Sequence, residues 1–167
     1  SSISGGESGT IENCINRASI TDKSSKVNRI GGVIGAAWSD GSSIVSLKIS
    51  NCQNYGDIYE TMSADKGGAG GILGASSRLN NLLIENCANY GSIQTAALGG
   101  TGGILGYCTY KNSVIVINGC QTAANITSTG NCVGGLIGAA DALQKELTIK
   151  NCAVTGTISG VDNVGGV

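Results

Sequence analysis

Cysteine is the residue of this chain with the widest range of possible chemistry, and five of the seven cysteines share one position of an internal repeat. Cysteines can form disulfides, bind metal ions or act as nucleophiles. The five lie 38, 35, 33 and 32 residues apart, whereas zinc-binding cysteines usually cluster within a few residues. We expect a column of reduced, buried thiols with no metal and no cofactor; a run of disulfides and a metal column are the alternatives. The column comprises Cys14, Cys52, Cys87, Cys120 and Cys152.

Cys108 and Cys132 lie outside this column, just after and just before glycine-rich blocks. If parallel strands stack these blocks, the two residues sit at opposite ends of the strand, which disfavours a bridge between them. The sequence leaves open whether either one forms a disulfide.

Acidic residues could form the carboxylate pair that glycoside-cleaving enzymes need. Asp57 and Glu60 are close in sequence, as are Glu7 and Glu12. None of the four recurs at a repeat position where it would stack on another acid. We therefore expect a chain that is not an enzyme, with a β-helical polysaccharide-cleaving enzyme as the alternative.

Two tyrosines could bind a sugar, because an aromatic ring offers a flat apolar face with a polar tip. Tyr55 and Tyr90 occupy one repeat position and should stack, flanked by Arg17 and Ala123. They are the candidate ligand-binding residues of a carbohydrate-binding module. The alternative is that the rings simply cover a corner of the fold.

Composition excludes several function classes. The chain contains no histidine, which rules out a Ser-His-Asp triad and a mixed Cys/His zinc site. The net charge of −1 without a basic run argues against a nucleic-acid partner. No apolar stretch reaches the 18 or so residues that would cross a bilayer, so we expect no membrane insertion.

The elements that position these residues repeat with them. Each cysteine of the column follows an alternating apolar pattern, such as Leu47-x-Ile49, and an isoleucine stands six residues after it. A block of the type Gly-Gly-x-x-Gly then follows, and we expect its glycines to form sharp corners or positive-φ conformations. These structural glycines are Gly31, Gly32, Gly35, Gly70, Gly71, Gly74, Gly102, Gly103, Gly106, Gly134, Gly135 and Gly138.

The alternation at spacing two is typical of strands, and no window carries a helical stripe. We predict an all-β fold: a parallel β-solenoid of about four and a half repeats of 32–38 residues, forming a single domain over residues 1–167. Equivalent residues should then stack about 4.8 Å apart. Asparagines would form two further ladders, one just before the cysteines and one two residues after them, while Gly119 in place of asparagine indicates drift. The asparagines are Asn13, Asn51, Asn86 and Asn151, and Asn16, Asn54 and Asn89.

The combination of Asn-Cys-x-Asn-x-Gly-x-Ile with the glycine-bounded blocks Gly71 to Gly74 and Gly103 to Gly106 resembles the GLUG-motif family of bacterial surface repeats. That family includes repeat regions beside adhesins and IgA-cleaving metallopeptidases. The peptidase chemistry does not carry over, because its His-Glu-x-x-His motif is missing here.

The resemblance implies a non-catalytic structural or adhesive repeat domain of an extracellular or cell-surface bacterial protein, part of a stalk or fibre. We expect its partners to be further repeats of the same chain or end-to-end copies, with a host or surface glycan or protein as another possibility. The last glycine block matches the inner ones as far as Val167, so we expect a fragment of a longer array.

Overall fold

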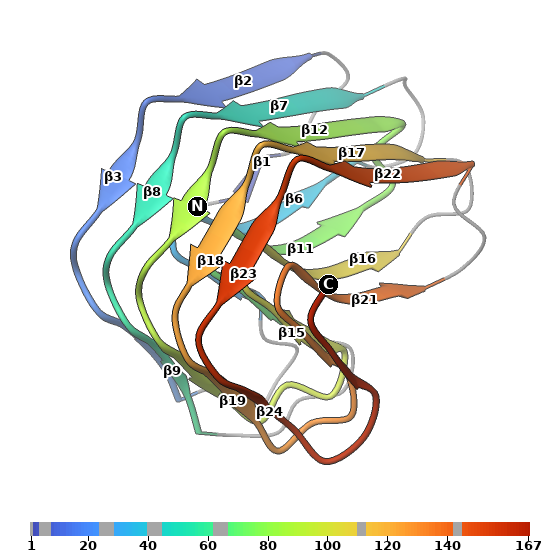
Figure 1. Cartoon of the computed structure of the whole chain (residues 1–167). Coiled ribbons are helices and arrows are strands. Elements are labelled where there is room, and N and C mark those ends of the chain that lie inside the picture. The colour runs from blue at the N-terminus through green and yellow to red at the C-terminus, as the bar shows by residue number, and fades with distance from the viewer. Residues whose placement is uncertain are drawn as a thin grey trace.

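A computed structural model of the chain describes residues 2–3, 8–23, 29–39, 45–61, 67–109, 113–141 and 145–167. Within these ranges the regular structure is entirely β, with no helix. The strands form five parallel sheets of five strands each, which surround a common interior like the sides of a coil (Figure 1). The predicted all-β parallel solenoid is confirmed.

Each sheet takes one strand from every coil, and we number the sheets in the order in which a coil passes through them. Sheet 1 contains β2 (Gly9–Glu12), β7 (Ser46–Ser50), β12 (Asn81–Glu85), β17 (Val114–Asn118) and β22 (Glu146–Lys150). Sheet 2 contains β3 (Ile15–Asn16), β8 (Gln53–Asn54), β13 (Ala88–Asn89), β18 (Gln121–Ala123) and β23 (Ala153–Thr155). Sheet 3 contains β4 (Ile20–Asp22), β9 (Ile58–Glu60), β14 (Ile93–Thr95), β19 (Ile126–Ser128) and β24 (Ile158–Ser159).

Sheets 4 and 5 carry the glycine-rich blocks. Sheet 4 contains β5 (Arg29–Gly31), β10 (Gly68–Gly70), β15 (Gly100–Gly102), β20 (Val133–Gly134) and β25 (Val164–Gly165). Sheet 5 contains β1 (Ser2–Ile3), β6 (Ile34–Trp38), β11 (Leu73–Ser77), β16 (Leu105–Thr109) and β21 (Ile137–Asp141). The number of coils differs slightly from the four and a half repeats expected from the sequence. The reason is that β1 lies before the first copy of the repeat and is the fifth strand of sheet 5.

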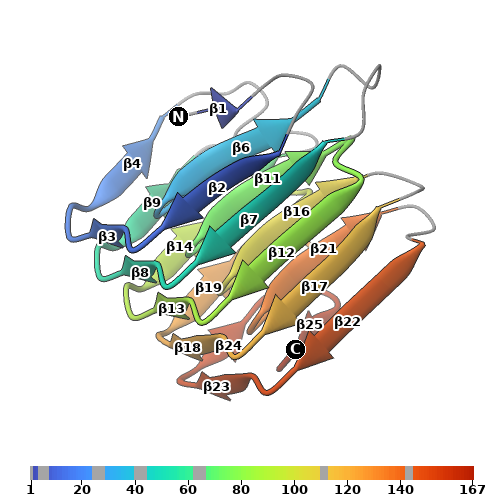
Figure 2. The ribbon, with the colours of Figure 1, turned by 90° about the horizontal axis from the view of Figure 1, so that it is seen from above.

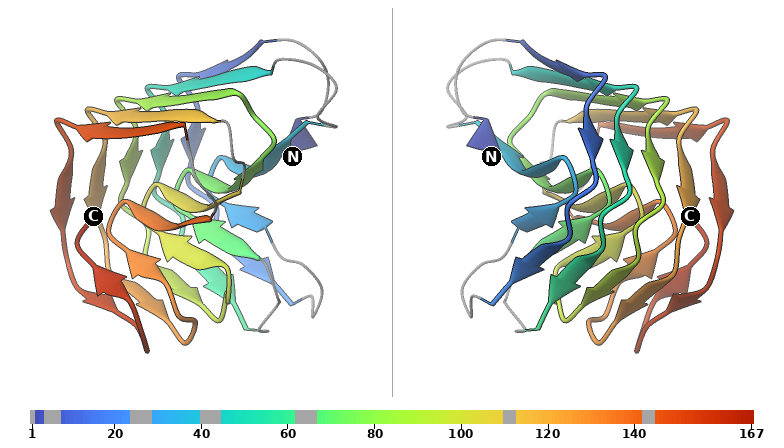
Figure 3. Two further views of the ribbon diagram at one scale, coloured as in Figure 1. Left: turned by 90° about the vertical axis from the view of Figure 1, so that its right-hand side faces the viewer. Right: turned by 90° about the vertical axis from the view of Figure 1, so that its left-hand side faces the viewer.

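One sequence repeat makes one coil, which the strand register shows directly. β7 pairs with β12 so that Leu47 faces Leu82 and Ile49 faces Ile84. β12 pairs in turn with β17, which places Ile117 beside Ile84. Figure 2 shows the strands of sheet 1 lying side by side, and the side views of Figure 3 show the coils stacked in chain order. Each apolar position of the repeat therefore forms a ladder along the axis.

The interior holds two apolar clusters separated by polar side chains. The larger cluster lies between sheets 1 and 5 and includes the buried column cysteines, with members such as Ile49 and Ile84 at 0% exposure. The smaller one is built on the isoleucines of sheet 3, including Ile58, Ile93 and Ile126. Alternate residues of each strand point inward, which is the pattern the sequence predicts for half-buried strands.

The corner between sheets 1 and 2 is made by the residue before each column cysteine. Asn13, Asn51, Asn86 and Asn151 all adopt positive φ, between 52° and 57°. Gly119 takes the same place in the fourth coil with φ 63°. Asparagine and glycine are the residues that enter this left-handed conformation at low cost, so Gly119 preserves the corner rather than marking drift.

The glycine blocks form the bends between sheets 4 and 5, but not through positive φ. Among the described residues, positive-φ glycines are Gly100, Gly119 and Gly156, none of which belongs to a block. The blocks are required by close approach: a Cβ on Gly71 would lie 2.2 Å from the carbonyl oxygen of Gly103 and 2.3 Å from Cγ of Asn89. Of the two alternatives expected for these glycines, the structure shows the sharp corners and not positive φ.

Candidate functional site

The cysteine column lies where sheet 1 turns into sheet 2. Cys52, Cys87 and Cys120 are at most 1% exposed, while Cys14 is exposed and Cys152 is half-buried at the two ends of the stack. All seven cysteines are free thiols. Each column thiol contacts the carbonyl oxygen two residues earlier, as Cys52 does with Ser50 at 3.2 Å and Cys87 with Glu85 at 3.3 Å. The column thus satisfies backbone acceptors at the asparagine corner.

Burial weakens the acidity of several cysteine thiols, whereas a hydrogen bond with Cys87 lowers the pKa of Cys120. Desolvation raises the pKa of Cys52 and of Cys108, the buried cysteine of sheet 5. A hydrogen bond with Cys120, followed by burial, raises the pKa of Cys87. Because the thiolate is the reactive form, these three residues are poor nucleophiles and poor metal ligands at neutral pH.

The asparagines two residues after the cysteines form a hydrogen-bonded ladder inside the coil. The Asn16 amide donates to the Asn54 side-chain oxygen at 2.7 Å, and Asn54 donates to Asn89 at 2.8 Å. The Asn54 amide also donates to the carbonyl of Gly56 at 2.8 Å. In the fourth coil Thr122 takes this position, and its hydroxyl makes no hydrogen bond within the described part of the chain. The ladder packs against the glycine bends, which explains why those bends exclude a Cβ.

The two tyrosines of the candidate ligand site stack on the outer face of sheet 2. Their ring centroids are 4.8 Å apart with an interplanar angle of 19°. The Arg17 guanidinium lies over the Tyr55 ring, 4.7 Å from its centroid. Tyr55, 41% exposed, therefore has one face against Tyr90 and the other beneath Arg17, and offers a sugar mainly its edge. Ligand binding by Tyr55 and Tyr90 stays a prediction, and the geometry favours the corner-cover alternative.

Two carboxylates stack, contrary to the sequence expectation. Asp22 pairs in register with Glu60 on adjacent strands of sheet 3. Both stand two residues after the isoleucine of that sheet, so their shared repeat position was present in the sequence but was not recognised. Glu60 is 3% exposed, on the inner side of the coil. Asp57 instead caps backbone, accepting from the Ser92 amide at 2.9 Å. Glu7 lies outside the described residues.

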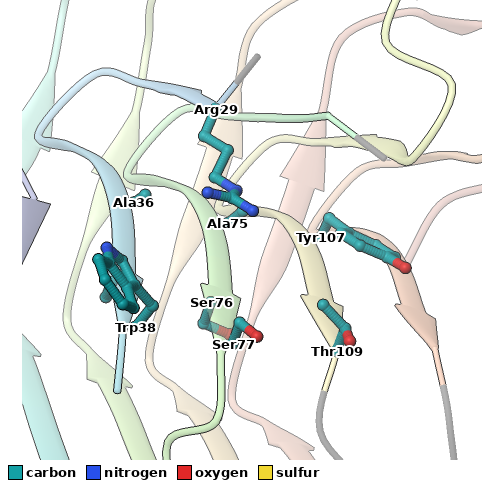
Figure 4. A pocket seen from close by; sticks show the side chains of 9 residues that line it. Arg29, Ala36, Trp38, Ala75, Ser76, Ser77, Tyr107 and Thr109 are labelled. Carbon is teal, nitrogen blue, oxygen red and sulfur yellow. The ribbon is translucent and has the colours of Figure 1, made fainter. Parts of the chain in front are cut away.

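Sequence patterns also missed a groove on the outer side of the corner between sheets 4 and 5. A cavity of about 280 Å³ is lined there by Arg29, Trp38, Ser77, Tyr107 and Thr109, together with small residues (Figure 4). In Figure 4 the Arg29 side chain reaches in front of β11, between Trp38 and Tyr107. The repeat pattern does not reveal these residues, because the positions of Arg29 and Trp38 hold other residue types in the next coil.

The floor of the cavity is formed by small side chains, while glycine in sheet 4 lets the two sheets approach closely. A Cβ on Gly68 in β10 would lie 2.6 Å from the Gly74 carbonyl oxygen and 2.7 Å from Cβ of Tyr107. The residues beneath the cavity in sheet 5 are Ala36 and Ala75. The two alanines leave a hollow that larger side chains surround.

In the described part of the chain, no group of three or more His, Cys, Asp or Glu side chains is placed to hold a metal ion. The described residues also contain no helix that could span a membrane.

Comparison with known proteins gives a match for one part of the chain. No curated protein and no solved structure matches the chain. The family model described as the GLUG motif matches residues 129–159. That segment runs through β20, β21, β22, β23 and β24, so the match spans one strand from each of the five sheets. The resemblance found in the sequence is confirmed: the chain carries the GLUG motif, and here the motif forms a coil of a parallel β-solenoid.

Proposed function

We propose that this chain is a non-catalytic structural and adhesive repeat domain of a secreted or cell-surface bacterial protein. The observation that carries the structural role is how each coil is buried. The same ladder position is 2% exposed at Leu82 and 0% at Ile115 inside the stack, but 42% at Leu147 in the last coil. Coils bury their core chiefly against their neighbours, as in a repeat array whose length can vary.

A coil insertion tests the structural role. A second copy of residues 87–119 placed between Gly119 and Cys120 adds one coil and keeps the corner residue before each cysteine. The extended chain should fold and melt at a higher temperature, because the added coil contributes one further coil–coil interface to the stack. A matched control inserts the same residues in scrambled order, which should lower the melting temperature. If the correct insertion also destabilises the chain, the repeats are not interchangeable units and the structural role is wrong.

The adhesive role is supported by the groove, and we propose a surface glycan or protein as its partner. Another coil with the same ladders, from this chain or a second copy, is the partner that we propose for the exposed last coil. Beads coated with the chain should be retained on glycan- or protein-coated surfaces, and beads coated with the heat-unfolded chain should not. Equal retention of both would contradict specific adhesion, whatever the outcome of the coil insertion.

A further inference from the structure

The groove at the corner of sheets 4 and 5 has a cation, Arg29, at its rim. Arg29 stacks in register with Gly68 and Gly100, so its two successors in the ladder have no side chain. Arg29 is exposed, and its guanidinium makes no hydrogen bond or ion pair with any described residue. The five donors of a guanidinium suit a planar anion, which arginine binds with two parallel hydrogen bonds.

An aromatic side chain and hydroxyls stand beside this cation. Trp38 is 43% exposed, although tryptophan side chains are on average highly buried. It pairs in register with Ser77, and Ser77 pairs with Thr109. The groove therefore offers a flat apolar surface and hydroxyl groups within the same cavity as the guanidinium (Figure 4). Flat apolar surface with a few convergent polar groups is the composition of a small-molecule site.

The described residues that line the groove contribute positive charge and no negative charge, and Asp141 continues the row of Trp38, Ser77 and Thr109 beyond the lining. A second cavity of about 320 Å³ shares Arg29, Trp38 and Ser77 with the first and adds Ser39 and Arg78. Neither lining includes an aspartate or glutamate among the described residues. Each volume is near the lower end of ligand pockets, about 300 Å³, which suits one sugar ring in each half of the groove.

We propose that this groove binds a carboxylate-bearing saccharide, with Arg29 holding the carboxylate and Trp38 packing on the apolar face of the ring. The inference rests on the adhesive function proposed above and names its ligand class. Ser77 and Thr109 supply hydrogen bonds to ring hydroxyls. The site is separate from the Tyr55 and Tyr90 stack, which lies on sheet 2.

Titration calorimetry with methyl β-D-glucuronide tests the proposal, with methyl β-D-glucoside as the neutral match and acetate as the carboxylate without a ring. The glucuronide should bind measurably more tightly than either, and its Kd should rise with added NaCl because salt screens the guanidinium. Digalacturonate, which can occupy both halves of the groove, should bind more tightly than the single ring. Equal affinity for glucuronide and glucoside would overturn the proposal, as would the absence of saturable binding to any acidic sugar.

Variants locate the site. Arg29→Gln should raise the Kd for glucuronide about tenfold or more, since it removes charged hydrogen bonds. Trp38→Ala should raise this Kd by a similar factor. Arg29→Lys keeps the charge without the planar fork, so its Kd should lie between those of wild type and Arg29→Gln. Both side chains are exposed, so the variants should melt like wild type. Arg17→Gln, the matched control on the tyrosine stack, should leave the Kd unchanged; if it weakens binding as much as Arg29→Gln, the groove is not the site.

The result separates this inference from the function on which it rests. Bead adhesion that survives Arg29→Gln, with no glucuronide binding, would reject the groove and keep the adhesive role. Glucuronide binding without any bead adhesion would keep the groove and reject the adhesive role.

Discussion

The glycine bends show how tightly single residues are constrained by the neighbouring coil. The Gly71 position faces both the backbone of the next coil and the buried Asn89. Gly71→Ala should lower the free energy of unfolding by about 3 kcal/mol, because the new methyl group meets backbone that cannot move away. Urea unfolding measures this loss.

Gly166→Ala is the matched control, since a Cβ there would meet nothing within 4 Å. Its effect should stay within about 0.5 kcal/mol. A Gly71→Ala chain as stable as Gly166→Ala would show that the coils are less closely spaced than described.

Buried thiols make stability depend on pH in the alkaline range. Desolvation raises the pKa of folded Cys108 above the ordinary cysteine value of about 8.5. Above that value the unfolded chain loses this proton while the folded chain keeps it, so the free energy of unfolding falls as pH rises. Cys108→Ala should make the fall between pH 8 and pH 10 shallower, by up to about 1.4 kcal/mol per pH unit. Urea unfolding with reductant at several pH values provides the test; an identical slope in the variant would contradict it.

At the scale of the elements, the asparagine ladder stops at Asn89 in the third coil. A substitution that extends the ladder into the fourth coil should therefore stabilise the fold. Thr122 occupies the position of Asn54 and Asn89, with a hydroxyl that makes no hydrogen bond to described residues. Thr122→Asn should let the new amide donate to the Ala124 carbonyl, as Asn54 does to Gly56, and accept from Asn89. We expect a gain of about 1 kcal/mol in unfolding free energy.

Thr122→Val keeps the shape of threonine and removes the hydroxyl, so it serves as the comparison that measures the gain from removing a buried unpaired polar group alone. Thermal and urea melts of the two variants distinguish ladder extension from simple removal of a buried hydroxyl. An asparagine variant less stable than wild type would mean that the fourth coil lacks room for the amide.

The ladders are the part of the structure that the sequence could predict. Recurrence of Leu-x-Ile, Asn-Cys and the glycine blocks at one period is sufficient for register, because like positions must stack in a parallel coil. The asparagine corners were not foreseen as left-handed, since their φ depends on where the chain turns. The groove could not be predicted at all: the positions of Arg29 and Trp38 hold other residue types in the following coils, and only the corner between sheets 4 and 5 brings the two side chains together.

At the scale of the whole molecule, stability comes from the contacts between neighbouring coils rather than from one central core. The cysteine column shows the gradient, with buried thiols in the inner coils and exposed or half-buried ones at Cys14 and Cys152. Unfolding should therefore begin at the outer coils, where each strand has a neighbour on one side.

One repeat making one coil is the central feature of this fold, and the isoleucine ladder of sheet 3 tests it most directly. Ile58 pairs in register with Ile20 on one side and Ile93 on the other, and Ile93 pairs with Ile126. Neighbouring strands lie roughly 4.8 Å apart and second neighbours roughly 9.6 Å. NOE spectroscopy of a chain labelled at the isoleucine δ1 methyl groups should show contacts from Ile58 to Ile20 and Ile93, and none to Ile126. Absence of the Ile58–Ile93 contact, or a direct Ile58–Ile126 contact, would contradict the one-coil repeat.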